Sequence, residues 1–197
     1  MPLVRSESDG REKDHHCDGQ SQRRGEQRAT LAKQVAAGAE ARGAEVKSFY
    51  LHGMDMSPCT ACDLCRDDSA KDCVIDDQMA SLYPKLRSAD VLVIASPIYW
   101  FTVSAQTKLF LDRCYALGGP DGNALKGKQI GIVLTYADPD PFSSGAVNAL
   151  RTFQDAFKYI GAEVVEMLYG SAWKAGEIRG NKELAHTQRK RSAYGAC

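Results

Sequence analysis

Two short, uninterrupted apolar runs constrain the fold of this chain more than any other feature of its sequence. Residues 91–95 read Val-Leu-Val-Ile-Ala and residues 130–135 read Ile-Gly-Ile-Val-Leu-Thr, with no charged residue in either run. Successive side chains of a strand point to opposite faces of its sheet, so a strand that is apolar throughout must be buried on both faces. Both faces of this sheet must therefore be covered by other elements.

Segments with apolar residues at helical spacing alternate with the apolar runs. We expect helices over residues 29–43, 77–86, 104–117 and 147–160, and strands over 44–51, 91–95, 130–135 and 162–168. Asp76 or Asp77 is the expected N-cap of the second helix, and Pro84 predicts a kink or an early end within it. Ser96 and Pro97 are expected to end the strand that precedes them. Such alternation is typical of α/β folds with a mainly parallel sheet.

Four of the seven cysteines lie close together, in the pattern Cys59-x2-Cys62-x2-Cys65-x7-Cys73. Zinc sites usually consist of two separated pairs of cysteines, whereas three closely spaced cysteines with a nearby fourth are typical of iron–sulfur clusters. The spacing favours a [4Fe–4S] cluster held by these four thiolates. Zinc, a thiol or disulfide pair, and free cysteines in a surface loop remain alternatives. Cys114 falls within an expected helix and is interpreted as a core residue.

Composition excludes several classes of protein. The 25 basic and 25 acidic residues cancel, which gives no electrostatic reason to expect nucleic acid as a partner. No apolar run approaches the roughly 20 residues of a membrane span. No secretion signal is recognisable, so we expect a cytoplasmic, reducing compartment, where clustered cysteines more often serve metal or redox chemistry than disulfides.

Aromatic residues follow the strand at 91–95, in the sequence Ser-Pro-Ile-Tyr-Trp-Phe at 96–101. Ligands of open parallel sheets bind beyond the carboxyl ends of the strands, and a second such end lies near Thr135. Backbone amides there can bind the carbonyls of a planar heterocycle, and aromatic side chains can stack on it. A hydrophobic plug or a dimer interface is an equally simple interpretation of these aromatic residues.

From about residue 29 to about residue 184, the chain resembles the flavodoxin-like NAD(P)H-dependent FMN reductases, and most closely their iron–sulfur flavoprotein branch. The resemblance rests on three stretches: residues 58–65 with 73–79, residues 96–100 with 104–108 and 110–113, and residues 172–173 with 176–181. The second stretch alone would indicate only the wider reductase family.

This resemblance implies an α/β, flavodoxin-like three-layer sandwich with a five-stranded parallel sheet and FMN at its switch point. It implies that FMN contacts two loops: Ser96, Pro97, Ile98, Tyr99 and Trp100, and Thr135, Tyr136 and Ala137. It also implies that Cys59, Cys62, Cys65 and Cys73 hold a [4Fe–4S] cluster near a flavin, in a homodimer or homotetramer. No residue is named as catalytic, because hydride and electron transfer take place on the flavin itself.

The expected function is that of an FMN-dependent NAD(P)H oxidoreductase or electron-transfer flavoprotein. Electrons would come from a reduced nicotinamide or a ferredoxin-like donor and pass to a quinone, a flavin or another small molecule, with the cluster as a relay. A cluster-free FMN or quinone reductase is the first alternative. The second is a zinc-stapled electron-carrier or interaction module without turnover, and the third is a non-functional variant of the family.

The beginning of the chain departs from the family. Residues 1–28 have balanced charges and almost no apolar residue after Val4, so we expect an atypical, disordered N-terminal arm. Residues 29–184 are the expected FMN-binding domain, with a cysteine loop at 58–76, and residues 185–197 are a basic tail. The family opens with a buried strand and a phosphate-binding loop. The run Asp-His-His-Cys-Asp at 14–18 cannot form that strand without burying unpaired charge.

A shifted reading frame would explain the missing strand. Permitted codons for Lys13 to Arg28, reread one nucleotide later, can encode Lys-Ile-Ile-Ile-Val-Thr-Ala-Ser-Pro-Asn-Gly-Gly-Glu-Asn-Ser-Ala. That sequence contains an apolar strand followed by a loop suited to phosphate. We therefore predict a frame shift upstream of Ala29, through mutation or sequencing error. Resequencing the gene tests this, and an in-frame run of codons for Asp-His-His-Cys-Asp would exclude the error.

Overall fold

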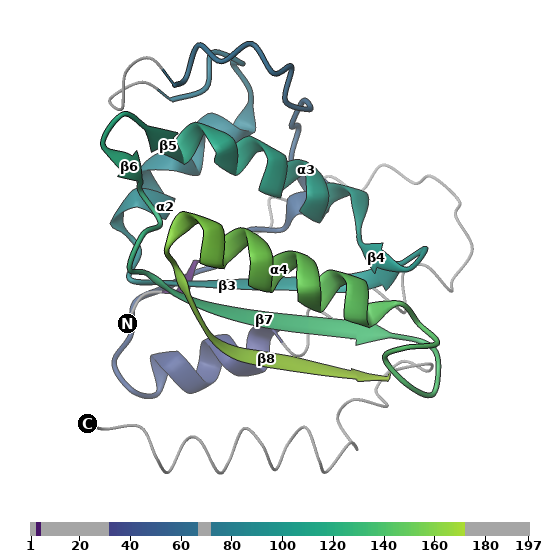
Figure 1. Cartoon of the computed structure of the whole chain (residues 1–197). Helices are drawn as coiled ribbons and strands as arrows, with labels where there is room; N and C mark the ends of the chain where they lie inside the picture. Colours follow the sequence, from purple (N-terminus) through teal and green to yellow (C-terminus); the bar gives the residue numbers. More distant parts are fainter. Residues whose placement is uncertain (1–2, 5–31, 67–71, 172–197) are drawn as a thin grey trace.

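The structure is a computed structural model that describes residues 3–4, 32–66 and 72–171 (Figure 1). Most of the expected arm at 1–28, the matching stretch at 172–181 and the basic tail at 185–197 therefore lie outside the described residues. The elements that carry the two apolar runs and the cysteine loop lie largely within them.

Three long parallel strands form the centre of the sheet. They are β3 (Val91–Tyr99), β7 (Gln129–Tyr136) and β8 (Glu163–Ser171), with β7 between the other two. The short strand β4 (Thr102–Val103) turns back on the end of β3 and pairs with it in antiparallel orientation. Beyond it on the chain, Gly118–Gly119 (β5) and Gly122–Asn123 (β6) form a separate small hairpin.

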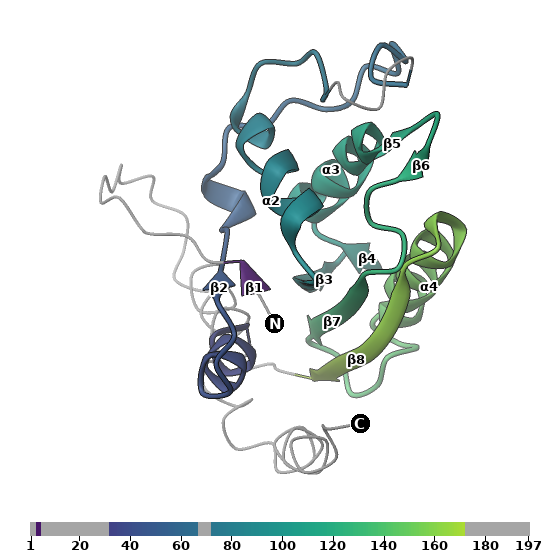
Figure 2. The ribbon, with the colours of Figure 1, turned by 90° about the vertical axis from the view of Figure 1, so that its left-hand side faces the viewer.

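Two further parallel strands lie beside β3 in a separate ladder. β1 (Leu3–Val4) pairs with β2 (Val46–Lys47), and β1 also contacts β3 (Figure 2). The spatial order β2-β1-β3-β7-β8 is the doubly wound flavodoxin order, in which the switch point falls between β1 and β3. The expected five parallel strands are thus present, but not as one continuous ladder, because β1 and β2 are only two residues long among the described residues.

Helices cover both faces of the sheet, as the apolar runs require. One face carries α2 (Tyr83–Ser88), α3 (Ala105–Arg113) and α4 (Ala146–Ile160), and the helical residues 32–40 lie on the other (Figure 2). Along β7, Ile130, Ile132 and Leu134 belong to the large core beneath α2, α3 and α4. Val133 points the opposite way and packs with Val35 of the other helical layer.

Local sequence signals set most element boundaries. Ser104 caps α3 by accepting a hydrogen bond from the backbone N–H of Thr107, and Gly161 ends α4 in the left-handed conformation. The start of α3 and the end of α4 therefore lie where they were expected. Asp77 caps a 3-10 helix (Gln78–Ser81), and Pro84 lies in the first turn of the α2 helix that follows. The helix expected at 77–86 is therefore divided in two.

Several expected boundaries were wrong, among them the end of the strand expected at 162–168, which continues as β8 to Ser171. β3 does not end at Ser96 and Pro97 but continues to Tyr99, because β4 supplies a hydrogen-bonding partner for its last two residues. The strand expected at 44–51 is confined to β2, and Leu51–Gly53 form a 3-10 turn instead. The last turn of the helix expected at 104–117 is likewise a 3-10 helix, at Cys114–Leu117. Among the described residues, no helix combines the length and apolar character that crossing a membrane requires.

Candidate functional site

The two expected flavin-contacting loops lie side by side at the carboxyl edge of the sheet. Pro97 of β3 is in register with Thr135 of β7, so residues 96–100 and 135–137 lie side by side where these two strands end. β1 contacts β3 on the side away from β7, which places this edge at the switch point in strand order. The structure thus brings together two loops that are well separated in the chain.

Ser96 has a structural role in holding this edge together. Its side chain is fully buried, and its hydroxyl donates to the carbonyl of Pro97 at 2.9 Å. It accepts from the backbone N–H of Ser104 and from the hydroxyl of Thr107, each at 3.1 Å. These bonds tie the start of α3 to the end of β3. The hydroxyl of Ser96 therefore points inward, and the backbone of this loop is what the edge can offer to a ligand.

The turn between β3 and β4 holds two aromatic residues in a strained conformation. Trp100 and Phe101 have φ angles of 47° and 67°, in the left-handed region that large side chains rarely adopt. Two residues with positive φ form the type of two-residue turn that suits a tight hairpin. The Trp100 side chain is 91% exposed. Backbone strain of this kind persists only where the surrounding structure enforces it, and it is concentrated at ligand-binding sites.

The start of α4 fixes this strained turn. The side-chain amide of Asn148 donates to the carbonyl of Phe101 at 3.1 Å. Gly145, the N-cap of α4, has a φ of 74°, and a Cβ added there would lie 2.5 Å from the Cβ of Phe101. The absence of a side chain at Gly145 thus lets the loop after β7 approach the turn after β3.

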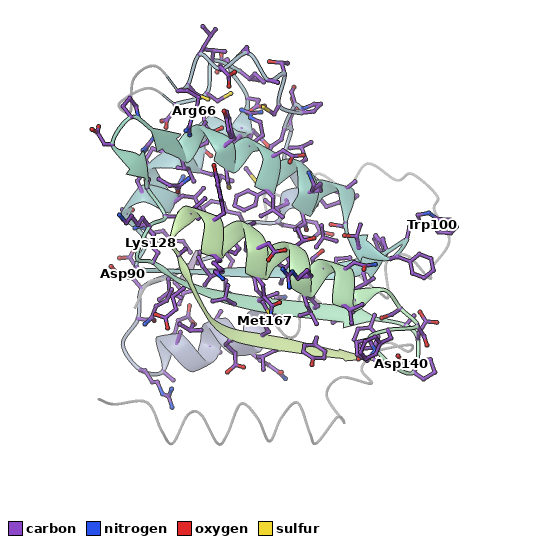
Figure 3. The ribbon with its side chains drawn as sticks, viewed as in Figure 1. Arg66, Asp90, Trp100, Lys128, Asp140 and Met167 are labelled. Atoms are coloured by element: carbon purple, nitrogen blue, oxygen red, sulfur yellow. The ribbon has the colours of Figure 1, made fainter. Side chains whose placement is uncertain are left out.

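An acidic turn lies on the same edge of the sheet. Asp140 accepts hydrogen bonds from the hydroxyl of Ser143 at 2.6 Å and from the backbone N–H groups of Phe142 and Ser143. These bonds, led by that of the Ser143 hydroxyl, lower the pKa of the Asp140 carboxyl. Trp100 and Asp140 both lie beyond the ends of the long strands (Figure 3). The bonds fix the shape of the loop between β7 and α4.

The cysteine loop lies elsewhere, on the far side of α3. Arg66, the residue after Cys65, lies beyond that helix and well away from Trp100 (Figure 3). Cys59 and Cys62 are exposed, Cys73 is half-buried and Cys65 is buried. Ala61 and Asp63 have positive φ angles, so the backbone between these cysteines turns tightly without glycine. Within a single chain, the cysteine loop and the carboxyl edge are therefore separate sites.

The electrostatics of the cysteines differ along the loop. Hydrogen bonds from the backbone of Leu64 and the side chain of Thr60 lower the pKa of the Cys62 thiol. Burial raises the pKa of Cys65, and the nearby thiols of Cys73, Cys62 and Cys59 raise it further. Four thiols are the donor set of an iron–sulfur cluster, so their chemistry fits one. Even so, across residues 32–66 and 72–171 no three Cys, His, Asp or Glu side chains converge as metal ligands.

A buried ion pair lies beneath the cysteine loop, and the sequence analysis did not single it out. Arg113, at the end of α3, donates to the Asp77 carboxylate at 2.6 and 3.2 Å, and both side chains are almost fully buried. Asp77 also accepts from the backbone N–H groups of Ser57 and Met79. Burial opposes ionisation of Asp77, but the Arg113 and backbone hydrogen bonds outweigh it and lower the pKa of the carboxyl. A sequence signal existed, because Arg113 continues the buried stripe of Thr107 and Phe110 on α3.

The comparisons with known proteins agree with this architecture. The profile of the family described as having a flavodoxin-like fold matches residues 18–194. An iron–sulfur flavoprotein of Archaeoglobus fulgidus is 44% identical over 152 residues, which cover 73% of this chain and 74% of the relative. The chain belongs to the flavodoxin-like FMN reductase family, in its iron–sulfur flavoprotein branch.

Other members of the flavodoxin-like family are more distant. An FMN-dependent NADH:quinone oxidoreductase of Vibrio parahaemolyticus is 27% identical, and the match covers 68% of this chain and 73% of that protein. Among solved structures, RosB with a bound flavin intermediate aligns with a TM-score of 0.57 and 20% identity, over 97% of this chain and 72% of its own. At that identity the structural likeness shows the flavodoxin-like fold alone.

We predict that Gly145→Ala destabilises this flavodoxin-like domain more than a glycine replacement without steric contact. The new Cβ would meet Phe101 in addition to straining the backbone, for a total cost of roughly 3 kcal/mol. Gly43→Ala is the matched control, because Gly43 has a φ of 83° with nothing within 4 Å of an added Cβ. It should cost only about 1 kcal/mol. Urea unfolding of both variants measures the difference, and equal losses would show that the contact with Phe101 is unimportant.

We predict that Asp77→Asn removes a contribution to the stability that the wild-type protein loses only at acidic pH. The folded pKa of Asp77 lies below its unfolded value, so the ion pair contributes stability above that unfolded value, which is lost as the pH falls through the folded pKa. At pH 7 the variant leaves Arg113 buried without its carboxylate, at a cost of about 3–5 kcal/mol. The difference in the free energy of unfolding between the variant and the wild type should therefore become smaller as the pH is lowered. Asp155→Asn breaks an exposed pair with Arg151 and should change stability by less than about 0.5 kcal/mol.

Proposed function

We propose that this protein is an FMN-dependent NAD(P)H oxidoreductase of the cytoplasm, in which a [4Fe–4S] cluster relays electrons. The observation that carries the proposal is the pairing of two loops at the switch point of the sheet, with a strained, exposed aromatic turn beside them. Planar ligands bind where backbone donors and aromatic surface converge at the carboxyl ends of parallel strands.

The carboxyl edge would hold the flavin through two segments. Backbone groups of residues 96–100 would bind the ring, since the hydroxyl of Ser96 is already occupied inside the protein. Residues 135–137 would border it from the neighbouring strand. When bound, FMN supplies hydride and electron transfer, so the protein needs to position the ring and limit access of water rather than provide an acid or base.

The cysteine loop would hold the cluster through Cys59, Cys62, Cys65 and Cys73. The donor set consists of four sulfur atoms, which is the ligation that [4Fe–4S] clusters require. The name of the Archaeoglobus relative supports the same assignment. Binding of a cluster would bring the exposed thiols of Cys59 and Cys62 toward the buried Cys65.

Names of relatives also support the proposed electron partners. The FMN-dependent NADH:quinone oxidoreductases among them favour a reduced nicotinamide as donor and a quinone as acceptor. A ferredoxin-like donor and another small-molecule acceptor fit the same chemistry. A homodimer or homotetramer would cover the exposed aromatic side chains of Trp100, Phe101 and Phe142.

One observation favours a second candidate, a reductase that uses FMN without a cluster. Among the described residues, no group of potential ligands is arranged to hold a metal ion. In that case the cysteines would be unused or would bind zinc, and the carboxyl edge alone would carry the activity.

We predict that anaerobically purified protein shows flavin absorbance with a broad brown shoulder and contains about four iron and four sulfide per chain. Cys62→Ser should lose the shoulder and most of the iron while it retains the flavin, because serine is a poor ligand for this cluster. Oxidation of NAD(P)H with an added quinone should then fall if the cluster relays electrons.

Cys114→Ala is the control for this experiment. Burial raises the pKa of Cys114 to about 12, and its sulfur packs against the core, so its loss should leave iron and flavin unchanged. A yellow protein without iron would refute the proposed cluster and support the second candidate, the cluster-free reductase. A colourless protein with one zinc per chain would overturn the proposed function. The absence of both flavin and metal would overturn it as well, because that result is expected of a non-functional variant of the family.

A further inference from the structure

A single buried side chain contacts both ends of the cysteine loop. The loop leaves the protein body after Ser57 and returns at Ile75 and Asp77. Arg113 donates to the carbonyl of Ser57 at 2.7 Å and to the carboxylate of Asp77 at 2.6 Å. A longer contact of 3.5 Å reaches the carbonyl of Ile75. The planar guanidinium therefore connects two chain segments that are separated by the whole cysteine motif.

A second layer of bonds supports this connection. Asp77 accepts from the backbone N–H of Ser57 at 2.8 Å, so the two ends of the loop are also bonded directly to each other. The hydroxyl of Tyr83, a fully buried residue of α2, donates to the backbone carbonyl of Arg113 at 3.2 Å. The position of Arg113 is thus set by α2 as well as by its own helix.

Other contacts to the loop are weaker or more exposed. Arg87 pairs with Asp72 near the end of the loop, but about a third of each side chain is exposed. Tyr115 donates to Asp63 at the exposed end of the loop. Because water competes for exposed partners, these contacts constrain the loop less than a fully buried, charged hydrogen bond does. Arg113 is therefore the strongest attachment of the loop among the described residues.

Stability alone does not explain a buried arginine at this position. Apolar side chains of similar volume commonly stabilise a protein as well as a buried ion pair does, because the pair must lose its hydration. An apolar side chain could not, however, donate to the Ser57 carbonyl and the Asp77 carboxylate at the same time. The guanidinium does so because its donors diverge in one rigid plane.

We propose that Arg113 is a positioning residue, which closes the base of the cysteine loop so that Cys65 and Cys73 can ligate one iron–sulfur centre. This role rests on the proposed cluster. Cys65 is 7% exposed and Cys73 is half-buried, whereas Cys59 and Cys62 are exposed. Closing the base thus fixes two ligands in advance and leaves two to close over the centre.

The test measures opening of the loop in the metal-free chain and cluster content in the reconstituted chain. The double variant Arg113→Met with Asp77→Asn removes both buried charges. The amide introduced at position 77 still has an oxygen that can cap the 3-10 helix Gln78–Ser81. Arg113→Lys is the second variant, because it keeps the charge but cannot donate along two directions in one plane. The matched control is Arg151→Met with Asp155→Asn, which removes an exposed ion pair from α4.

The first readout is the alkylation rate of each cysteine in metal-free protein, followed by peptide mass spectrometry. Loss of the hydrogen bonds from Arg113 to Ser57 and Asp77 should increase the alkylation rate of Cys65 about tenfold. The rate at Cys114, whose sulfur packs against the core, should not change, and the control pair should alter neither. Iron and sulfide per chain after anaerobic reconstitution should fall by more than half in both variants, while flavin content stays that of the wild type.

Two results would overturn the role of Arg113. Unchanged labelling of Cys65 with normal iron content would show that the loop closes without it. Equal acceleration at Cys65 and Cys114 would show that Arg113 merely supports the fold as a whole. If the double variant does not fold, Arg113→Lys decides between the same outcomes. A wild-type chain that takes up no iron would refute the proposed cluster instead, and labelling of the metal-free protein would still decide whether Arg113 closes the loop.

Discussion

The buried pair between Arg113 and Asp77 is the interaction on which the candidate metal site depends. A charged pair that is removed from water is stable only if groups of the protein replace its hydration. Here Arg113 comes from α3, and its partners come from the two ends of the cysteine loop. The same carboxylate caps the 3-10 helix before α2. The loop, the helix that follows it and α3 are therefore held by one set of bonds. Loss of either charged member would leave a buried charge without a partner.

At the carboxyl edge the constraint is steric rather than electrostatic. The strained turn at Trp100 and Phe101 is held by Asn148 and by the close approach of Gly145. The strain persists because α4 packs firmly through Phe153 and Phe157, which are buried and stacked on each other. Packing at the middle of α4 thus determines how the aromatic surface is presented at the edge of the sheet.

The parts of the structure that depend on local pattern could be predicted from the sequence. The apolar runs predicted the central strands, helical spacing predicted α4 up to its end at Ile160, and Asp77 was one of two predicted caps. The pairing of Arg113 with Asp77 could not be predicted, because it joins residues 36 positions apart through tertiary packing. The extension of β3 to Tyr99 was also missed, since Pro97 indicates a strand end unless a hairpin partner follows it.

The two strands that border the switch point differ in how completely they are formed among the described residues. A flavin site at this position needs both neighbouring strands, because one loop binds the ring and the loop after the first strand binds the phosphate. The β3 side is fully formed, with its loop and turn fixed by buried hydrogen bonds. On the other side, among the described residues, β1 comprises Leu3 and Val4, pairs with β2 and contacts β3. Leu3 and Val4 thus stand in the place of the family's first strand, and they complete the strand order β2-β1-β3-β7-β8 among the described residues.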